Sequence, residues 1–71
     1  MNMVKYNDEL AKNIRIERAR LKISQLKLAE MAEVSLDTIN LIERGLGNPR
    51  FSTIVAIAKA LNVDLNTLIP L

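Results

Sequence analysis

The chain has 71 residues, of which 10 are Lys or Arg and 8 are Asp or Glu, and its formal net charge of +2 describes a mildly basic chain the size of one domain. It has no cysteine, which excludes disulfides, cysteine metal sites and thiol catalysis, and no histidine, which removes the commonest general base and metal ligand. No apolar run approaches the ~20 residues of a membrane span, and residues 1–10 are too polar for a signal peptide, so we expect a cytoplasmic protein with no membrane partner.

The first predicted helix covers about residues 7–21. Asn7 is a suitable N-cap, and Asp8 and Glu9 suit the positive end of the helix dipole. The apolar positions at helical spacing, which we expect to face the core, are Leu10, Ile14 and Leu21. Arg18 falls on the same stripe although it is charged.

Two short helices are predicted next. One runs from the N-cap Ser24 to about Ala32, and the other runs from the N-cap Ser35 to about Arg44. Their inner faces are predicted to consist of Leu28, Ala29 and Ala32 in the first helix and of Ile39, Ile42 and Glu43 in the second. Gly45 is well placed to end the second helix in a left-handed conformation, and a loop follows.

Ser52 is the predicted N-cap of a fourth helix. The buried face of this helix follows the spacing i, i+3, i+4, i+7 and consists of Ile54, Ile57, Ala58 and Leu61. Asn62 can end it in a left-handed conformation, and Asp64 can cap a last short turn that ends at Leu68 before Pro70. No segment alternates like a strand and all connections are short, so we predict an all-α, compact five-helix domain that spans the whole chain.

The central helix pair has the spacing of a helix-turn-helix at about residues 24–44. A helix of about eight residues is followed by a short turn and then by a second, capped helix. The small Ala29 would let the two helices approach closely, and Val34 would anchor the turn in the core. Spacing alone leaves two alternatives open, because short helix pairs with tight turns also occur in bundles that do not bind DNA.

A run of residues at fixed spacing carries a resemblance to a known family. The run reads Ser24-Gln25-x-x-Leu28-Ala29-x-x-Ala32-x-Val34-Ser35-x-x-Thr38-Ile39-x-x-Ile42-Glu43-x-Gly45-x-x-Asn48-Pro49, followed by Thr53, Ile57-Ala58-x-Ala60-Leu61-x-Val63 and Leu68. It resembles the phage-repressor and Cro-like (Cro/C1-type) helix-turn-helix family over about residues 10–69, and the chain is similar in size to the restriction–modification controller proteins. The resemblance implies a lambda-repressor-like domain that binds double-stranded DNA and acts as a transcriptional regulator, typically a repressor.

The resemblance also implies roles for individual residues. The second motif helix, at about residues 35–44, would lie in the major groove with its N-terminal part toward the base edges. The positions that face bases in the family are Ser35, Leu36, Asp37 and Leu41. The positions near the phosphate backbone are Gln25, Thr38, Asn40, Arg44, Asn48 and Arg50. Gln25, at the start of the first motif helix, would contact a phosphate together with free backbone N–H groups.

The chain departs from the family pattern in three places. Lys22 and Glu33 stand after the first two helices, where the family often has glycine, and a left-handed Glu33 would cost about 1 kcal/mol relative to glycine. The recognition helix carries Leu36, Asp37 and Leu41 in place of Gln or Arg. Leucine can contact a thymine methyl and Asp can accept from cytosine N4, so we predict modest direct readout with a contribution from DNA shape. Alternatively, the two leucines only pack sideways.

Arg18 and Glu43 each occupy a helical position at which the stripe requires an apolar residue. Two opposite charges at such positions are expected to pair, because one buried charge alone would cost several kcal/mol. The family resemblance also places an Arg–Glu bridge between the first helix and the recognition helix. We therefore predict a structural salt bridge between these residues, and the alternative is two exposed charges at the rim of the core.

The C-terminal segment is unusually apolar. Its apolar residues are Val63, Leu65, Leu68, Ile69 and Leu71. Because so short a chain is not expected to bury all of them, we predict an exposed patch that forms a homodimer interface. A two-fold dimer would place two recognition helices about 34 Å apart, which suits a palindromic operator. Alternatively, these residues close the small core.

Enzymatic activity is the least expected class of function. The chain has no carboxylate pair beside a glycine-rich phosphate loop, and its two glycines match no nucleotide motif. No catalytic residue, cofactor or metal site is predicted. The main rival to DNA binding is a protein-interaction module on the same fold, such as the antitoxin of a toxin–antitoxin pair or a co-regulator that contacts RNA polymerase.

Overall fold

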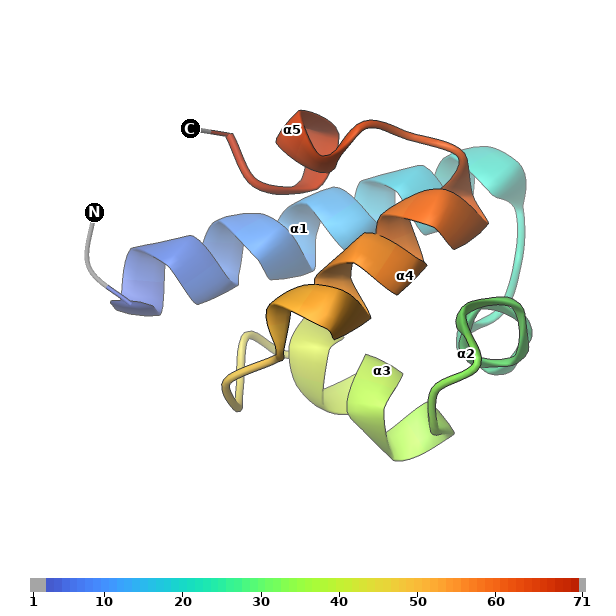
Figure 1. Cartoon of the computed structure of the whole chain (residues 1–71), viewed down its shortest axis with the longest axis horizontal. Coiled ribbons are helices and arrows are strands. Elements are labelled where there is room, and N and C mark those ends of the chain that lie inside the picture. Colours follow the sequence, from blue (N-terminus) through green and yellow to red (C-terminus); the bar gives the residue numbers. More distant parts are fainter. Residues whose placement is uncertain (1–2, 71) are drawn as a thin grey trace.

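The computed structural model describes residues 3–70, and the side chains of residues 6–70. This part of the chain has no strand and forms five α-helices, which are α1 (Met3–Leu21), α2 (Gln25–Ala32), α3 (Leu36–Glu43), α4 (Phe51–Leu61) and α5 (Leu65–Leu68) (Figure 1). The predicted all-α, five-helix architecture is therefore confirmed. None of the described helices is long and apolar enough to cross a membrane.

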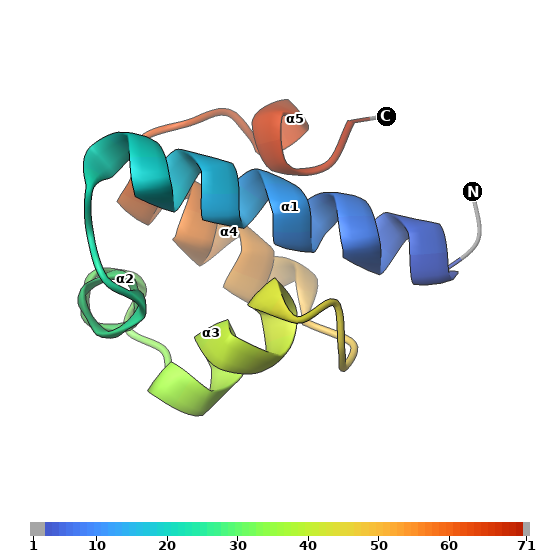
Figure 2. The same cartoon turned by 180° about the vertical axis from the view of Figure 1, so that it is seen from behind.

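The longest helix, α1, is the element around which the others pack. It contacts α3, α4 and α5, while α2 packs against α3 and α4. Figures 1 and 2 view the molecule from opposite sides, and both place α5 on one side of α1 and the α2–α3 pair on the other. The helix-turn-helix pair is thus held at the edge of the bundle that lies away from the C-terminal segment.

The core is built from apolar stripes contributed by all five helices. Its large, fully buried side chains are Leu10, Ile14, Leu28, Ile39, Ile54, Ile57, Leu61 and Leu68. Residues at the spacing i, i+3, i+4, i+7 share one face of a helix, so each stripe turns toward the centre. The small Ala29 and Ala32 are also buried, on the side of α2 that faces the core. The predicted inner faces of α2, α3 and α4 are therefore confirmed.

Serine caps begin both helices of the central pair. The Ser24 hydroxyl accepts from the backbone N–H of Lys27 at 3.0 Å, and the Ser35 hydroxyl accepts from that of Thr38 at 3.0 Å. Each bond satisfies a backbone donor that has no partner within the helix. Asp64 occupies the same position before α5 but makes no side-chain capping bond. All three caps lie where the sequence predicts them.

Three helices end at a residue with left-handed backbone conformation that is not glycine. Lys22, Glu33 and Asn62 each have a φ of 58°, and they follow α1, α2 and α4 respectively. Gly45, with a φ of 75°, follows α3 after Arg44. These four positions are the predicted helix ends, and only Gly45 adopts its conformation without a steric cost.

The start of α1 differs from the prediction. The helix begins at Met3, so Asn7 lies inside it and is not an N-cap, and the two acidic residues that follow lie beyond the first turn. The Asn7 Nδ2 instead donates to the carbonyl of Gly47 at 3.1 Å, a long-range contact that a local capping signal cannot reveal. Leu21 is also exposed rather than buried, because Ile23 packs against the core at this end of the helix.

The start of α4 also differs from the prediction. The N-cap is Arg50 rather than Ser52, and Ser52 lies in the first turn of the helix. Arg50 has the extended conformation of a cap residue, and its carbonyl accepts from the N–H groups of Thr53 and Ile54 at 3.0 and 3.1 Å. The backbone alone begins this helix, since no side chain caps it.

The predicted exposed patch at the C-terminus is wrong for the residues that the structure describes. Leu68 is 0% and Ile69 is 8% exposed, and both belong to the core. Val63 and Leu65 are half-buried and pack against the same core, while Leu71 lies outside the described residues. The physical reason is that α5 packs against α1 and α4, so it closes the core as the alternative interpretation holds.

Candidate nucleic-acid interface

The outer face of α3 is the most prominent feature of the helix-turn-helix pair. Ile39, Ile42 and Glu43 are buried, and they fix which side of the helix meets the core. Leu36 and Leu41 are each 43% exposed, and Asp37 between them in the chain is also exposed. The structure therefore brings together, on one solvent-facing surface, the side chains that the sequence assigns to the base-reading positions.

Polar groups at the start of α3 are already engaged within the protein. The Ser35 hydroxyl both caps the helix and makes a 2.8 Å hydrogen bond with the Thr38 hydroxyl. Asp37 differs, because no described side chain pairs with its carboxylate. Its carboxylate is thus a hydrogen-bond acceptor on the outer face of α3 that no described side chain engages.

The inner side of α3 is anchored by Glu43, which is 4% exposed. The Nε of Arg18 donates to Oε2 of Glu43 at 2.8 Å, and its Nη2 donates to Oε1 at 2.9 Å. The predicted ion pair is therefore present and is bidentate. A third guanidinium nitrogen of Arg18 donates to the carbonyl of Ile23 at 3.0 Å. These bonds join α1, the loop after it and α3.

Hydrogen bonding to the Glu43 carboxylate raises the pKa of Arg18, an effect that burial of the guanidinium partly opposes. The pair therefore keeps its positive partner charged, and the bridge holds because both carboxylate oxygens are satisfied.

Two further donors reach Glu43 that sequence reasoning did not assign to it. The Nε2 of Gln25 donates to Oε1 at 3.2 Å, and the Nη1 of Arg15 donates to the main-chain carbonyl of Glu43. The only signal for Arg15 was its place three residues before Arg18 on α1. Gln25 is half-buried, so its side-chain amide faces the protein interior in this structure. A phosphate contact from this amide stays a prediction.

The loop after α3 adds polar and apolar side chains next to the outer face of this helix. Arg44, Asn48 and Arg50 are exposed there, at the positions assigned to the phosphate backbone. A groove of about 260 Å³ opens between α3, this loop and the start of α4, and Leu41 and Leu46 line it. Sequence reasoning missed Leu46, whose position between two glycines was the available signal.

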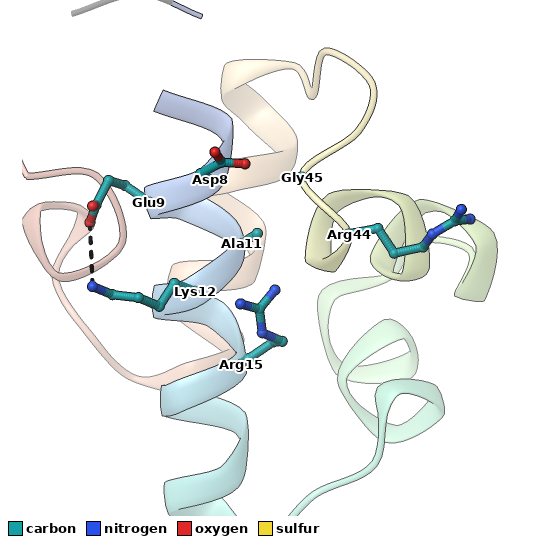
Figure 3. A pocket seen from close by; sticks show the side chains of 7 residues that line it. All are labelled: Asp8, Glu9, Ala11, Lys12, Arg15, Arg44 and Gly45. Carbon is teal, nitrogen blue, oxygen red and sulfur yellow. Dashed lines mark ion pairs between the residues drawn. The ribbon is translucent and has the colours of Figure 1, made fainter. Parts of the chain in front are cut away.

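A second, more polar pocket of about 380 Å³ lies between α1 and the C-terminal end of α3 (Figure 3). Figure 3 shows Arg15 pointing from α1 toward α3, while Lys12 pairs with Glu9 at 4.0 Å on the other side of α1. Charges of both signs line this pocket. Among the described residues, no cluster of three or more His, Cys, Asp or Glu side chains could hold a metal ion.

The arrangement of the helices matches a known protein family. The model of the HTH_3 helix-turn-helix family matches residues 14–68, which is most of the chain. The chain belongs to the HTH_3 helix-turn-helix family. The resemblance on which the sequence prediction rests is therefore confirmed. No curated protein matches the chain.

Solved structures share the fold. The hypothetical transcription factor NHTF from Neisseria is 28% identical, with a TM-score of 0.89 over 97% of this chain and 79% of its own. An HTH_3 family transcriptional regulator from Vibrio cholerae is 24% identical, with a TM-score of 0.89 over 94% of this chain and 38% of its own. The restriction-modification controller protein C.AhdI from Aeromonas hydrophila is 24% identical, with a TM-score of 0.85 over 89% of this chain and 96% of its own.

The chain therefore has the fold of the HTH_3 transcriptional regulators, which is that of a DNA-binding regulator. The likeness to the Vibrio and Aeromonas proteins concerns the fold alone. Regulators of the HTH_3 family are generally not enzymes.

Proposed function

We propose that the chain is a sequence-specific transcriptional regulator that binds a palindromic operator as a homodimer, with residues 35–44 in the major groove. The observation that carries the proposal is the orientation of α3. Its inner face is fixed by Ile39, Ile42 and the Arg18–Glu43 pair, so one defined outer face is presented to solvent. A helix of this width fits the major groove of B-DNA.

The contacts of this proposal divide into two classes. Base edges would be read by the N-terminal part of α3 through Ser35, Leu36, Asp37 and Leu41. The phosphate backbone would be held by Gln25, Thr38, Asn40, Arg44, Asn48 and Arg50. Of the second group, Arg44 and Arg50 are exposed cations on the two sides of the loop after α3, so they contribute most of the electrostatic attraction.

The homodimer needs a contact surface other than α5, because Leu68 and Ile69 belong to the core. Phe51 is 65% exposed, which is the largest exposed fraction among the large apolar side chains that the structure describes. Val55 follows it one turn later on α4 and is half-buried. We place the two-fold contact at this start of α4, where each copy would cover the Phe51 of the other.

Salt dependence of duplex binding tests the DNA-binding part of the proposal. Three or four phosphate contacts per subunit predict that log K falls with log salt at a slope of about −6 for a dimer. Arg44→Ala and Arg50→Ala should each make the slope shallower by about 2, since each removes one contact from both subunits. Lys59→Ala, at an exposed cation on α4, is the matched control and should leave the slope unchanged.

The measurement is fluorescence anisotropy with duplexes selected from a random pool, at several salt concentrations. A slope near zero for the unmodified protein would overturn the proposal. If the chain then co-purified with a stoichiometric protein partner, it would be an interaction module on the same fold.

A further inference from the structure

The reading face of α3 combines two chemically different groups next to each other. The carboxylate of Asp37 can only accept hydrogen bonds, and no described side chain donates to it or forms an ion pair with it. Leu41 lies one turn later on the same side of the helix and is 43% exposed, as is Leu36. The side chains that usually read bases through two hydrogen bonds, Arg, Gln and Asn, are missing from these three positions.

Each group selects a different feature of a base edge. The major-groove donors in unmodified DNA are the amino groups of cytosine N4 and adenine N6, whereas thymine O4 is an acceptor that a carboxylate repels. The apolar group in that groove is the methyl on C5 of thymine. In unmodified DNA the donor and the methyl group therefore belong to different base pairs. In 5-methylcytosine they stand on neighbouring ring atoms of one base.

The loop after α3 adds a further apolar side chain next to Leu41. The groove of about 260 Å³ beside Leu41 has a mixed lining, in which Ile42 and Leu46 are apolar and Thr38, Asn48 and Arg50 are polar. Leu46 is 45% exposed, and its backbone N–H donates to the Leu41 carbonyl at 3.0 Å, which holds the loop against the end of α3. Leu46 therefore extends the exposed apolar surface of Leu41 onto the loop that follows α3.

From this juxtaposition we infer that α3 reads the C5 methyl groups of pyrimidines, and that Asp37 makes 5-methylcytosine the preferred one. Asp37 accepts from the outward hydrogen of N4, and Leu41 covers the adjacent methyl group. Leu36 adds a second apolar contact at the N-terminal end of the helix. The inference rests on the proposed function, because it concerns the same DNA-reading surface.

The test compares four bases at the same position of both half-sites, after operators have been selected from random pools with and without 5-methylcytosine in place of cytosine. Cytosine, 5-methylcytosine, uracil and thymine combine an amino or oxo group with the presence or absence of the methyl group. One buried methyl group corresponds to about 0.8 kcal/mol, or about fourfold in affinity per half-site. A symmetric duplex should therefore bind about 15-fold more tightly with 5-methylcytosine than with cytosine. Thymine should bind more tightly than uracil, by a similar factor.

Protein variants assign this preference to its residues. Leu41→Ala should remove most of the methyl effect, and Asp37→Asn should remove the preference for 5-methylcytosine over thymine, because an amide can also donate to O4. Ile16→Ala, at a 52% exposed apolar position on α1, is the matched control and should keep both preferences. N4-methylcytosine is the matched control base, since its methyl group replaces the outward hydrogen that Asp37 requires.

The outcomes separate the two levels of the hypothesis. If a selected duplex binds with a steep salt dependence but binds equally well with or without C5 methyl groups, the inference is overturned and the proposed function stands. If thymine is bound more tightly than 5-methylcytosine, the role of Asp37 is wrong. If no duplex binds with salt dependence, the proposed function itself fails.

Discussion

At the residue scale, Glu43 determines how the recognition helix is fixed. Its carboxylate is buried and accepts from Arg18 at both oxygens and from Gln25 at one of them, while Arg15 donates to its carbonyl. A buried charge is tolerated only when its hydrogen-bonding capacity is used, and here Arg18 from α1 and Gln25 from α2 use it. Glu43 therefore fixes the position of α3 relative to α1 and α2, and with it the position of the outer face of α3.

Replacing Glu43 tests this role. Glu43→Ala leaves the Arg18 guanidinium and the Gln25 amide without their partner, and we expect a loss of about 3 kcal/mol in the free energy of unfolding. Glu43→Gln keeps one acceptor oxygen and should lose less. Glu9→Ala is the control, because the Lys12–Glu9 pair lies on the surface of α1, with 58% and 36% of the two side chains exposed, and should contribute less than ~1 kcal/mol. Urea unfolding provides the measurement, and a cost below ~0.5 kcal/mol for Glu43→Ala would contradict the structural role.

The pH dependence of this pair follows from the raised pKa of Arg18. A group whose pKa is raised by folding stabilises the native state below its unfolded pKa and loses that contribution only as pH rises through the folded value. For an arginine this window lies at strongly alkaline pH. Arg18 is therefore not expected to change the stability of the domain across the neutral range.

At the scale of the helices, the three left-handed residues that are not glycine mark sites where the chain carries local strain. Glu33 is the one that connects the two helices of the DNA-binding motif. Its backbone conformation is imposed by the turn, in which the N–H of Val34 donates to the Ala29 carbonyl at 3.0 Å. This conformation has a steric free-energy cost for an L-residue and none for glycine. The turn is therefore a site where a substitution can stabilise the domain.

We expect Glu33→Gly to stabilise the domain by up to about 1 kcal/mol, since the relief of strain exceeds the added entropy of the unfolded chain. The same change three residues earlier, Glu30→Gly, lies inside α2 at an exposed position and should destabilise by about 1 kcal/mol. Thermal unfolding of the two variants compares them directly. Destabilisation by both would show that the turn is not strained at Glu33.

At the scale of the whole molecule, the packing of α5 decides which surface is left for a partner. The Nδ2 of Asn13 on α1 donates to the Leu68 carbonyl at 3.0 Å, so a polar contact as well as an apolar one holds this segment in place. The apolar surface that remains at the start of α4 is small, and burying one Phe side chain contributes about 1.5–3 kcal/mol. We therefore expect a weak dimer in solution that forms fully on the operator.

Phe51→Glu tests this dimer surface. Two glutamates brought together across a two-fold contact repel each other, so we expect operator binding at least tenfold weaker. Binding of an isolated half-site should fall much less, since there the new charge acts only through its neighbour Arg50. Ile16→Glu introduces the same charge at an exposed apolar position on α1 and is the control. Sedimentation velocity with the operator duplex reports whether one or two copies bind. Two copies bound equally well by both variants would rule out this contact.

Much of the fold was predictable because its signals are local. The caps at Ser24 and Ser35, the left-handed ends at Glu33 and Asn62, and the buried stripe of α4 each depend on residues within about one or two helical turns. The Arg18–Glu43 pair was predictable too, since each charge interrupts an apolar stripe and only pairing makes its burial tolerable. The positions of the base-reading residues came from the family resemblance, and their contact with DNA stays a prediction.

The failures share a different physical cause. Asn7 has the local signature of a cap, but its side chain bonds to Gly47, a partner far away in the chain. The Gln25 amide likewise bonds to the distant Glu43, a contact that the sequence did not reveal, while its phosphate contact stays a prediction. The C-terminal segment was predicted to form an exposed patch because so short a chain was not expected to bury all of its apolar residues, yet α5 packs against α1 and α4 and Leu68 and Ile69 are buried.

The sequence by itself thus determined the helices, the residues at which they stop and the family, because these follow from spacing along the chain. Tertiary structure alone decided that the C-terminal segment closes the core, that Phe51 rather than this segment is exposed, and that Gln25 and Arg15 converge on Glu43. Burial and hydrogen-bond partnership depend on which distant residues meet, and that is fixed only when all five helices pack together.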